Sequence, residues 1–213
     1  MNRKTSIAVA IVIAIVAVIA GMLLSRALMK GMESSDTVVL TAGTLLEPPR
    51  PLPSFSLVDL ASQPFGNDSL RGTWSFLFFG FTNCPDVCPT TLRMLAQTEQ
   101  SLADLPAAQR PRVILVSVDP KRDTPEQLAT YVKFFSPAFV GVTGAPEALD
   151  TFTRQVGVPV AITPTDGGGY TVDHSAAVFL IDPTGAMRAL FSPPHSPKAI
   201  AADYRRIVDS MAH

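Results

Sequence analysis

The feature that most constrains the fold of this chain is a pair of cysteines that directly follows a strongly apolar segment. Residues Ser75–Phe81 form an almost unbroken apolar run rich in aromatic side chains, which predicts a strand buried on both faces. Cys84 and Cys88, the two cysteines of the sequence, follow this run, and each precedes a proline. Because a residue before proline disfavours the helical region, we expect the thiols in a loop where the strand stops.

A helix is predicted to begin at Pro89, since proline fits the first helical position, and to continue through Leu102. Cys88 then lies near the helix N-terminus, where unpaired N–H groups and the helix dipole favour thiolate over thiol, although Asp86 opposes that shift. This placement predicts a reactive or metal-binding pair. The alternative is a structural disulfide, but the ring that it would close is too small to remove much unfolded-chain entropy.

The composition indicates a folded protein with no basic surface for nucleic acid, because 47% of the 213 residues are hydrophobic, 16% are charged and the net charge is -1. Eighteen consecutive uncharged residues, Ile7–Leu24, predict one transmembrane helix, which makes residues 1–29 a membrane anchor. Arg3 and Lys4 favour a cytoplasmic N-terminus. A cleaved signal peptide is the alternative, since small residues flank Arg26 at a spacing that a peptidase accepts.

The domain after this anchor is therefore expected outside the cytoplasm. No Arg-rich, acid-poor amphipathic presequence is present, so we predict a bacterial inner membrane with the soluble domain on the periplasmic side. An oxidising compartment lets a neighbouring cysteine pair cycle between dithiol and disulfide. Cys84 and Cys88 are accordingly a candidate redox disulfide as well as candidate metal ligands.

Residues 30–51 mix Gly, Ser, Thr and Pro and are predicted to be a linker, which leaves residues 52–213 as one domain. A hairpin is expected over Phe55–Asn67, and an inserted loop or hairpin over Val158–Tyr170. Strands and helices alternate along the rest, with strands at Val113–Val118, Phe139–Val142, Val178–Ile181 and Met187–Phe191 and helices that begin at Thr124, Gly144 and Ser196. The predicted fold is therefore α/β and thioredoxin-like, with an N-terminal hairpin extension and an insertion.

The three histidines differ in where the predicted elements place them. His213 is the last residue, and His195 lies in a proline-rich loop, where a solvated side chain is expected. His174 comes four residues before the strand at Val178–Ile181. If that strand runs antiparallel to its neighbours, its start meets their carboxyl ends, and His174 approaches the two cysteines.

Two thiolates and one imidazole form a soft ligand set that suits Cu(I) and can hold Cu(II) with an added oxygen ligand. Zinc would require a fourth ligand, which the sequence does not clearly offer. We therefore predict a copper site formed by Cys84, Cys88 and His174.

Three segments resemble the Sco/SenC family of membrane-anchored, thioredoxin-like copper chaperones. They are FGFTNCPDVCPTT at Phe79–Thr91, VSVDPKRDTPEQLATYVKFF at Val116–Phe135 and VDHSAAVFLIDPTG at Val172–Gly185. The resemblance covers about Leu52–Val208. It implies that Cys84, Cys88 and His174 bind copper, which comes from an upstream copper donor protein and goes to the binuclear copper site of cytochrome c oxidase subunit II during oxidase assembly. Asn83 departs from many relatives, which carry histidine there, but that position is not a ligand of the family.

The resemblance also implies a second role, in which thiol-disulfide exchange reduces the partner's cysteines before copper arrives. We expect a metallochaperone rather than an enzyme, with a thiol-disulfide oxidoreductase as the alternative. A peroxidase is a third interpretation, because Val87–Thr90 resembles the peroxiredoxin cysteine segment, but Pro85 stands where that family has threonine. Asp119 and Asp123 match the family's DPxxDTP segment, and we expect them either to end a strand and start a helix or to take part in docking.

Overall fold

The computed structural model describes residues 13–25 and 38–211, and the chain divides into two compact units, Met1–Thr37 and Val38–His213. In the first unit, residues 13–25 form a helix with exposed apolar side chains. Across the described ranges, no helix is both long and apolar enough to cross a membrane. The predicted transmembrane segment also includes residues 7–12, which lie outside the described residues, so the membrane anchor stays a prediction.

The second unit is built on an eight-stranded sheet in the order β1-β10-β9-β4-β5-β6-β2-β3. Its strands are β1 (Gly43–Pro51), β2 (Ser56–Asp59), β3 (Pro64–Gly66), β4 (Ser75–Gly80), β5 (Arg112–Ser117), β6 (Val140–Thr143), β9 (Val178–Ile181) and β10 (Ala186–Phe191). Strand β4 lies in the middle of the sheet and is buried along its whole length, as its apolar run predicts. It pairs in parallel with β5 and antiparallel with β9. The start of β9 therefore meets the carboxyl ends of β4 and β5, which confirms the orientation expected for this strand.

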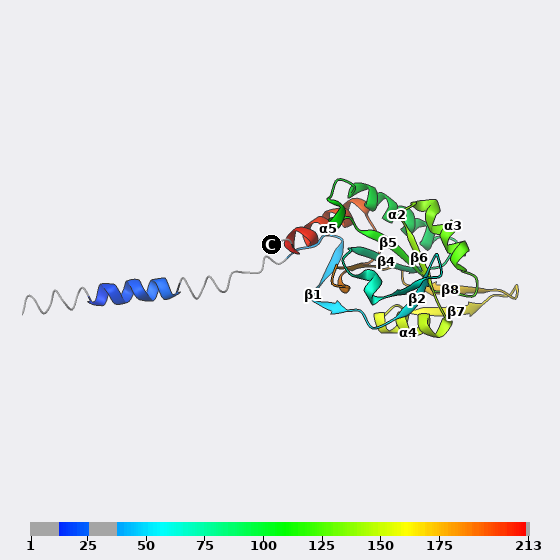
Figure 1. Cartoon of the computed structure of the whole chain (residues 1–213), viewed down its shortest axis with the longest axis horizontal. Coiled ribbons are helices and arrows are strands. Elements are labelled where there is room, and N and C mark those ends of the chain that lie inside the picture. Colours follow the sequence, from blue (N-terminus) through cyan, green and yellow to red (C-terminus); the bar gives the residue numbers. More distant parts are fainter. Residues whose placement is uncertain (1–12, 26–37, 212–213) are drawn as a thin grey trace, which may run out of the picture. The chain divides into compact units, whose positions relative to one another are not determined.

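Helices cover both faces of the sheet because the apolar side chains of β4 alternate between them. On one face, the Phe76 ring lies 5.5 Å from the Tyr204 ring, and on the other the Phe79 ring lies 5.6 Å from the Phe152 ring. The first face carries α2 (Val87–Ser101), α3 (Pro125–Phe135) and α5 (Pro197–Met211), and the second carries α4 (Pro146–Val156) (Figure 1). Two short 3-10 helices complete the elements, η1 (Asn67–Leu70) and η2 (Ala107–Gln109). This arrangement confirms the predicted α/β order.

The hairpins that the turn residues predict are both present. Strands β2 and β3 pair antiparallel as the N-terminal hairpin. The insertion is a hairpin of β7 (Val160–Pro164) and β8 (Tyr170–His174), which form a separate two-stranded sheet. This hairpin extends beyond the segment predicted for it, because strand β8 begins at Tyr170 and ends at His174.

The prediction that residues 30–51 are a linker does not hold for the last nine of them. Residues Gly43–Pro51 form β1, which pairs antiparallel with β10 at the edge of the sheet. The prolines of this segment suggested a linker, but an edge strand tolerates proline because one side of its backbone has no partner strand. The register also shifts between Leu45 and Arg50, which accommodates the irregular backbone.

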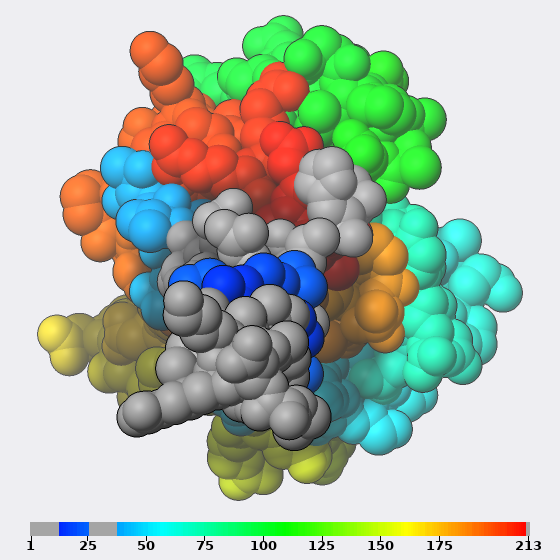
Figure 2. All heavy atoms as spheres, turned by 90° about the vertical axis from the view of Figure 1, so that its left-hand side faces the viewer, coloured from blue at the N-terminus to red at the C-terminus, as the bar shows by residue number. Residues whose placement is uncertain are grey.

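A buried carboxylate on α5 joins the segment before β1 to the body of the domain. Asp203 is fully buried and accepts hydrogen bonds from the backbone N–H groups of Thr41, Ala42 and Gly43 at 2.9, 2.7 and 3.1 Å. Figure 2 faces this part of the molecule and shows α5 (red) beside the residues that follow α2 (green), where Arg205 pairs with Asp104. Asp203 therefore replaces water as the acceptor for three backbone donors.

Replacing Asp203 by alanine is expected to lower the free energy of unfolding by about 3 kcal/mol, since it leaves several partly buried donors without an acceptor. Urea unfolding of the metal-free protein measures this. The control is Asp209→Ala, which removes an exposed carboxylate from the same helix and should change stability by less than about 0.5 kcal/mol. Equal effects of the two substitutions would contradict a specific role for Asp203.

Candidate metal centre

The cysteine loop leaves the carboxyl end of β4 and enters α2 within a few residues. The N–H of Cys84 donates to the carbonyl of Phe81 at 3.3 Å, which closes a turn directly after the strand. Helix α2 begins at Val87, two residues before the predicted start, so Pro89 is its third residue. Proline is tolerated there because the N–H groups of a first helical turn have no intrahelical partner. Cys88 consequently lies inside the first turn, and its N–H donates to Cys84 Sγ at 3.4 Å.

The two thiols are free in the structure and differ in exposure. Cys84 is half-buried, whereas Cys88 is fully buried. Burial raises the pKa of the Cys88 thiol well above its ordinary value. The structure therefore does not support a thiolate at Cys88 in the metal-free protein, because burial disfavours the charged form. The redox disulfide between the two residues stays a prediction.

This difference predicts that Cys84 reacts with iodoacetamide near neutral pH at least about tenfold faster than Cys88, because alkylation requires an accessible thiolate. Peptide mass spectrometry of the metal-free, reduced protein over time measures both rates. In denaturant the two rates should become similar, which is the internal control. Equal rates in the folded protein would show that α2 opens readily around Cys88.

His174 reaches the thiols from the end of β8. Its Nε2 lies 3.1 Å from Cys88 Sγ, and its Nδ1 lies 3.0 Å from the carbonyl oxygen of Ser175. A carbonyl can only accept, so Nδ1 carries the proton and Nε2 presents its lone pair to the thiol. The rings of Phe78 and Phe81 contact the imidazole edge-on at 5.9 and 5.7 Å. Burial lowers the pKa of His174, which favours the neutral form that binds metals.

The structure brings the three predicted ligands together. The ligand atoms of Cys84, Cys88 and His174 all lie within 4.8 Å of one another. A metal ion with bonds of roughly 2.0 to 2.3 Å holds its ligand atoms within about 4.6 Å of one another. Small side-chain adjustments therefore suffice for one ion to bind all three atoms. Asn83 is exposed and lies outside this ligand group.

Two buried acidic residues stabilise the loops around the thiols. Asp123 accepts hydrogen bonds from the N–H and hydroxyl of Thr82 at 3.1 and 2.5 Å and from the hydroxyl of Ser117 at 2.6 Å. It therefore ties the cysteine loop to the end of β5. Burial raises the pKa of Asp123, while the hydrogen bonds from Ser117 and Thr82 lower it. Asp119 accepts from the Tyr170 hydroxyl at 2.7 Å and from Arg122. Both carboxylates are buried, which favours the structural interpretation over docking.

His195 does not have the environment expected for it. It is half-buried, and its Nε2 lies 2.8 Å from the carbonyl oxygen of Ala176, two residues beyond His174. It stays outside the group of ligand atoms. The sequence carried no signal for this contact, because it joins two loops that only the fold places together. Tyr170 and Arg122 were missed as members of the site's surroundings for the same reason.

The domain has a thioredoxin-like α/β fold, and two thiols and one imidazole lie together at the carboxyl edge of its sheet. These features define a class of thioredoxin-like proteins with a candidate metal centre of cysteine and histidine. Within that class, the chain belongs to the SCO1/SenC family, whose sequence profile matches residues 45–209. The resemblance that the sequence motifs indicated is thereby confirmed.

Individual relatives agree with this assignment. The chain is 40% identical over 152 residues to a Stutzerimonas stutzeri protein whose name describes it as copper-binding. The match covers 70% of this chain and 73% of that protein. It is 36% identical over 153 residues to the mitochondrial SCO2 homolog of Bos taurus, which covers 71% of this chain and 58% of the bovine protein, less than two thirds of its length. Arabidopsis thaliana ScoI, solved with copper bound, has a TM-score of 0.69 and 31% sequence identity, with 74% of this chain and 98% of that chain covered.

Proposed function

We propose that the protein is a copper metallochaperone that binds copper through Cys84, Cys88 and His174 and delivers it to the binuclear copper site of cytochrome c oxidase subunit II. The observation that carries the proposal is the convergence of these three ligand atoms within 4.8 Å, from two elements far apart in the sequence. Copper-bound Sco structures with this fold support the choice of metal. An upstream copper donor protein supplies the ion in this proposal.

The donor set accounts for the preference for copper. Two thiolates and a neutral imidazole are soft or borderline ligands, which suit Cu(I). Both thiols lose their protons on binding, and the electrostatic cost of burying two thiolates is offset by the positive charge of the ion. The hydrogen bond from Nδ1 of His174 to Ser175 holds the imidazole with Nε2 toward Cys88, so this ligand is oriented before the metal arrives.

Access from solvent supports transfer rather than storage. Cys84 is half-buried, and a groove of about 510 Å³ lies against His174, lined by Asp173, Ser175 and residues of α4 and β7. A ligand of the acceptor protein can therefore approach the ion while Cys88, the buried thiol, still holds it. Exchange of one ligand at a time moves copper between proteins without release of the free ion.

The test is metal analysis of the reduced full-length protein after reconstitution with Cu(I) and with Cu(II), together with absorption and EPR spectra. We expect one copper ion per chain, with sulfur-to-copper charge transfer for Cu(II). Failure to retain either ion, together with a Cys84–Cys88 disulfide that forms and breaks readily, would reject the chaperone and favour the oxidoreductase.

The second candidate function is thiol-disulfide exchange, and the observation that favours it is the half-buried Cys84 sulfur, which accepts the N–H of Cys88. In this reaction the Cys84 thiolate attacks a partner disulfide and one partner thiolate leaves. Cys88, after loss of its proton, attacks the mixed disulfide, so the partner leaves as a dithiol and the chain keeps a Cys84–Cys88 disulfide. The raised pKa of Cys88 slows the second step. Disulfide turnover without copper, unchanged by His174→Ala, would establish this role.

The proposal includes attachment of residues 1–29 to a bacterial inner membrane, with the copper domain on the periplasmic side. The uncharged stretch Ile7–Leu24 and the preceding Arg3 and Lys4 support it. Carbonate extraction of membranes, followed by protease treatment of spheroplasts, tests both parts. Extraction of the chain by carbonate would reject the membrane anchor. Protection of the domain from protease in spheroplasts would reject the periplasmic orientation.

A further inference from the structure

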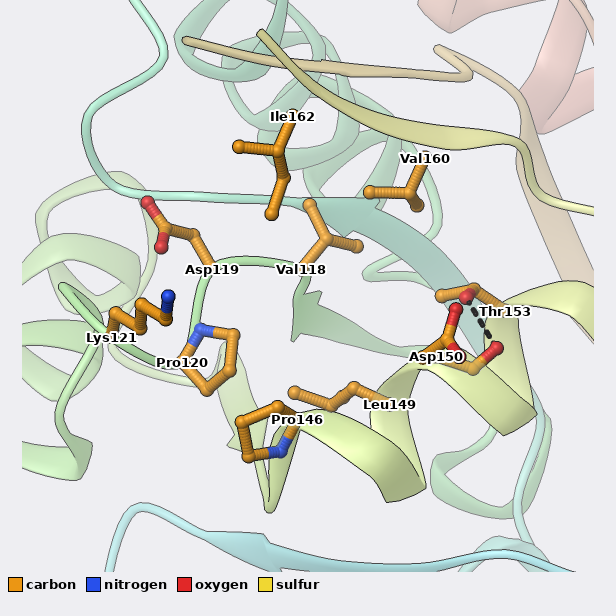
Figure 3. A pocket seen from close by; sticks show the side chains of 10 residues that line it. All are labelled: Val118, Asp119, Pro120, Lys121, Pro146, Leu149, Asp150, Thr153, Val160 and Ile162. Atoms are coloured by element: carbon orange, nitrogen blue, oxygen red, sulfur yellow. Dashed lines mark hydrogen bonds between the residues drawn. The ribbon is translucent and has the colours of Figure 1, made fainter. Parts of the chain in front are cut away.

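The hairpin that carries His174 is only partly packed against the rest of the domain. Strands β7 and β8 pair with each other, and no ladder within residues 38–211 joins them to the eight-stranded sheet. A cavity of about 230 Å³ lies between β7 and the body of the domain, lined by Val160 and Ile162 on one side and by Pro120 and Leu149 on the other (Figure 3). Few contacts therefore determine how closely the hairpin approaches the thiols.

Two hydrogen bonds join Tyr170, at the start of β8, to the loop after β5. The hydroxyl of Tyr170 donates to the Asp119 carboxylate at 2.7 Å, and Asp119 is 2% exposed. Arg122 donates to the carbonyl of Tyr170 at 3.2 Å, pairs with Asp119, and places its guanidinium 4.0 Å from the centre of the Tyr170 ring. A hydrogen bond to a carboxylate is among the stronger contacts available to a side chain, and this one is partly buried.

This contact and the metal ligand lie at opposite ends of one short strand. Tyr170 begins β8 and His174 ends it, and because side chains alternate along a strand, both residues face the same side, as does the buried Val172 between them. Ring contacts connect Arg122 to His174 as well. The Arg122 guanidinium lies 5.6 Å from the centre of the Phe81 ring, and the Phe81 ring contacts the His174 imidazole. The position of Tyr170 therefore constrains the position of His174.

We infer that the Tyr170 hydroxyl, bound to Asp119 and supported by Arg122, is a latch that holds the β7–β8 hairpin against the domain and so places the His174 imidazole beside the two thiols. Tyr170 is a positioning residue that acts on the metal through His174. The inference rests on the proposed function, because the placement of His174 matters only if this residue is the third copper ligand. Opening of the latch removes His174 and leaves a site with two thiolates.

The first test measures hydrogen exchange of the metal-free, full-length protein by mass spectrometry. Tyr170→Phe removes the hydroxyl and keeps the ring, and we expect the amides paired between β7 and β8 to exchange about tenfold faster. The matched control is Tyr204→Phe, which also loses a tyrosine hydroxyl that donates a hydrogen bond, here to the backbone carbonyl of Gln109 on the α5 side of the domain. It should leave exchange of the hairpin unchanged. Unchanged exchange in Tyr170→Phe would overturn the latch.

The second test asks whether Tyr170 acts through His174, by competition for Cu(I) with a chelator such as bicinchoninate. We expect Tyr170→Phe to weaken Cu(I) binding about tenfold in the wild-type background and not at all in the His174→Ala background. Equal weakening in both backgrounds, or none in the first, would overturn the positioning role. If the unmodified protein holds no Cu(I), the proposed function fails and this part fails with it, while hydrogen exchange still decides the latch itself.

Discussion

Replacing Cys88 by serine is expected to weaken Cu(I) binding by more than roughly 100-fold, since even partners outside the ligand set typically account for 10- to 100-fold in metal affinity. The serine oxygen is a hard, protonated ligand that Cu(I) does not favour. Cys88 is also the proposed ligand that contacts His174 directly, at 3.1 Å. Chelator competition on the reduced protein measures the affinity, and metal analysis after desalting measures retention.

Loss of copper in Cys88→Ser has to be separated from loss of the fold. The substitution places a hydroxyl at a fully buried position and is expected to lower the free energy of unfolding by about 1 to 3 kcal/mol. Cys84→Ser, at the half-buried position, should lose copper with a smaller cost in stability. For the imidazole, His174→Ala should weaken binding, whereas the matched control His195→Ala should not. Retention of copper by Cys88→Ser at wild-type affinity would exclude the proposed ligand set.

Gly80→Ala is expected to damage both stability and copper binding, because the residue has no room for a side chain. A Cβ at position 80 would lie 2.9 Å from Cys88 Sγ and 3.1 Å from atoms of both Leu115 and Phe78. Distances this short force β4 and α2 apart or turn the Cys88 side chain away from His174. We expect the free energy of unfolding to fall by about 1 to 3 kcal/mol and Cu(I) binding to weaken by more than about tenfold.

Urea unfolding of the metal-free protein and chelator competition separate these two effects. Gly167→Ala is the matched control, since a Cβ at that position meets no atom within 4 Å and the backbone there has no positive φ. It should leave both quantities unchanged within about 0.5 kcal/mol. A Gly80→Ala protein as stable as the wild type and with the same affinity would show that the contact between β4 and Cys88 is loose.

The sequence predicted most elements because their local signals agree with their environment. The apolar run at Ser75–Phe81 fits only a strand with both faces covered, and Thr124, where a helix was predicted to begin, is the N-cap of α3 and forms a capping box with Gln127. Where local signals were ambiguous, the prediction was wrong. The segment Gly43–Pro51 resembles a linker by composition, and its strand structure comes from pairing with β10, a segment about 140 residues later in the chain.

The sequence by itself indicated the three candidate ligands, since two thiols at the end of a buried strand and a histidine ahead of an antiparallel strand already constrain the chemistry. Only the tertiary structure decided the burial of Cys88, which raises the pKa of its thiol, and the approach of His174 to within 3.1 Å of its sulfur. It also decided the contact of Tyr170 with Asp119, 51 positions away. The physical reason is that burial and long-range contacts depend on which elements pack around a residue, whereas strand, turn and helix signals depend on its neighbours in the chain.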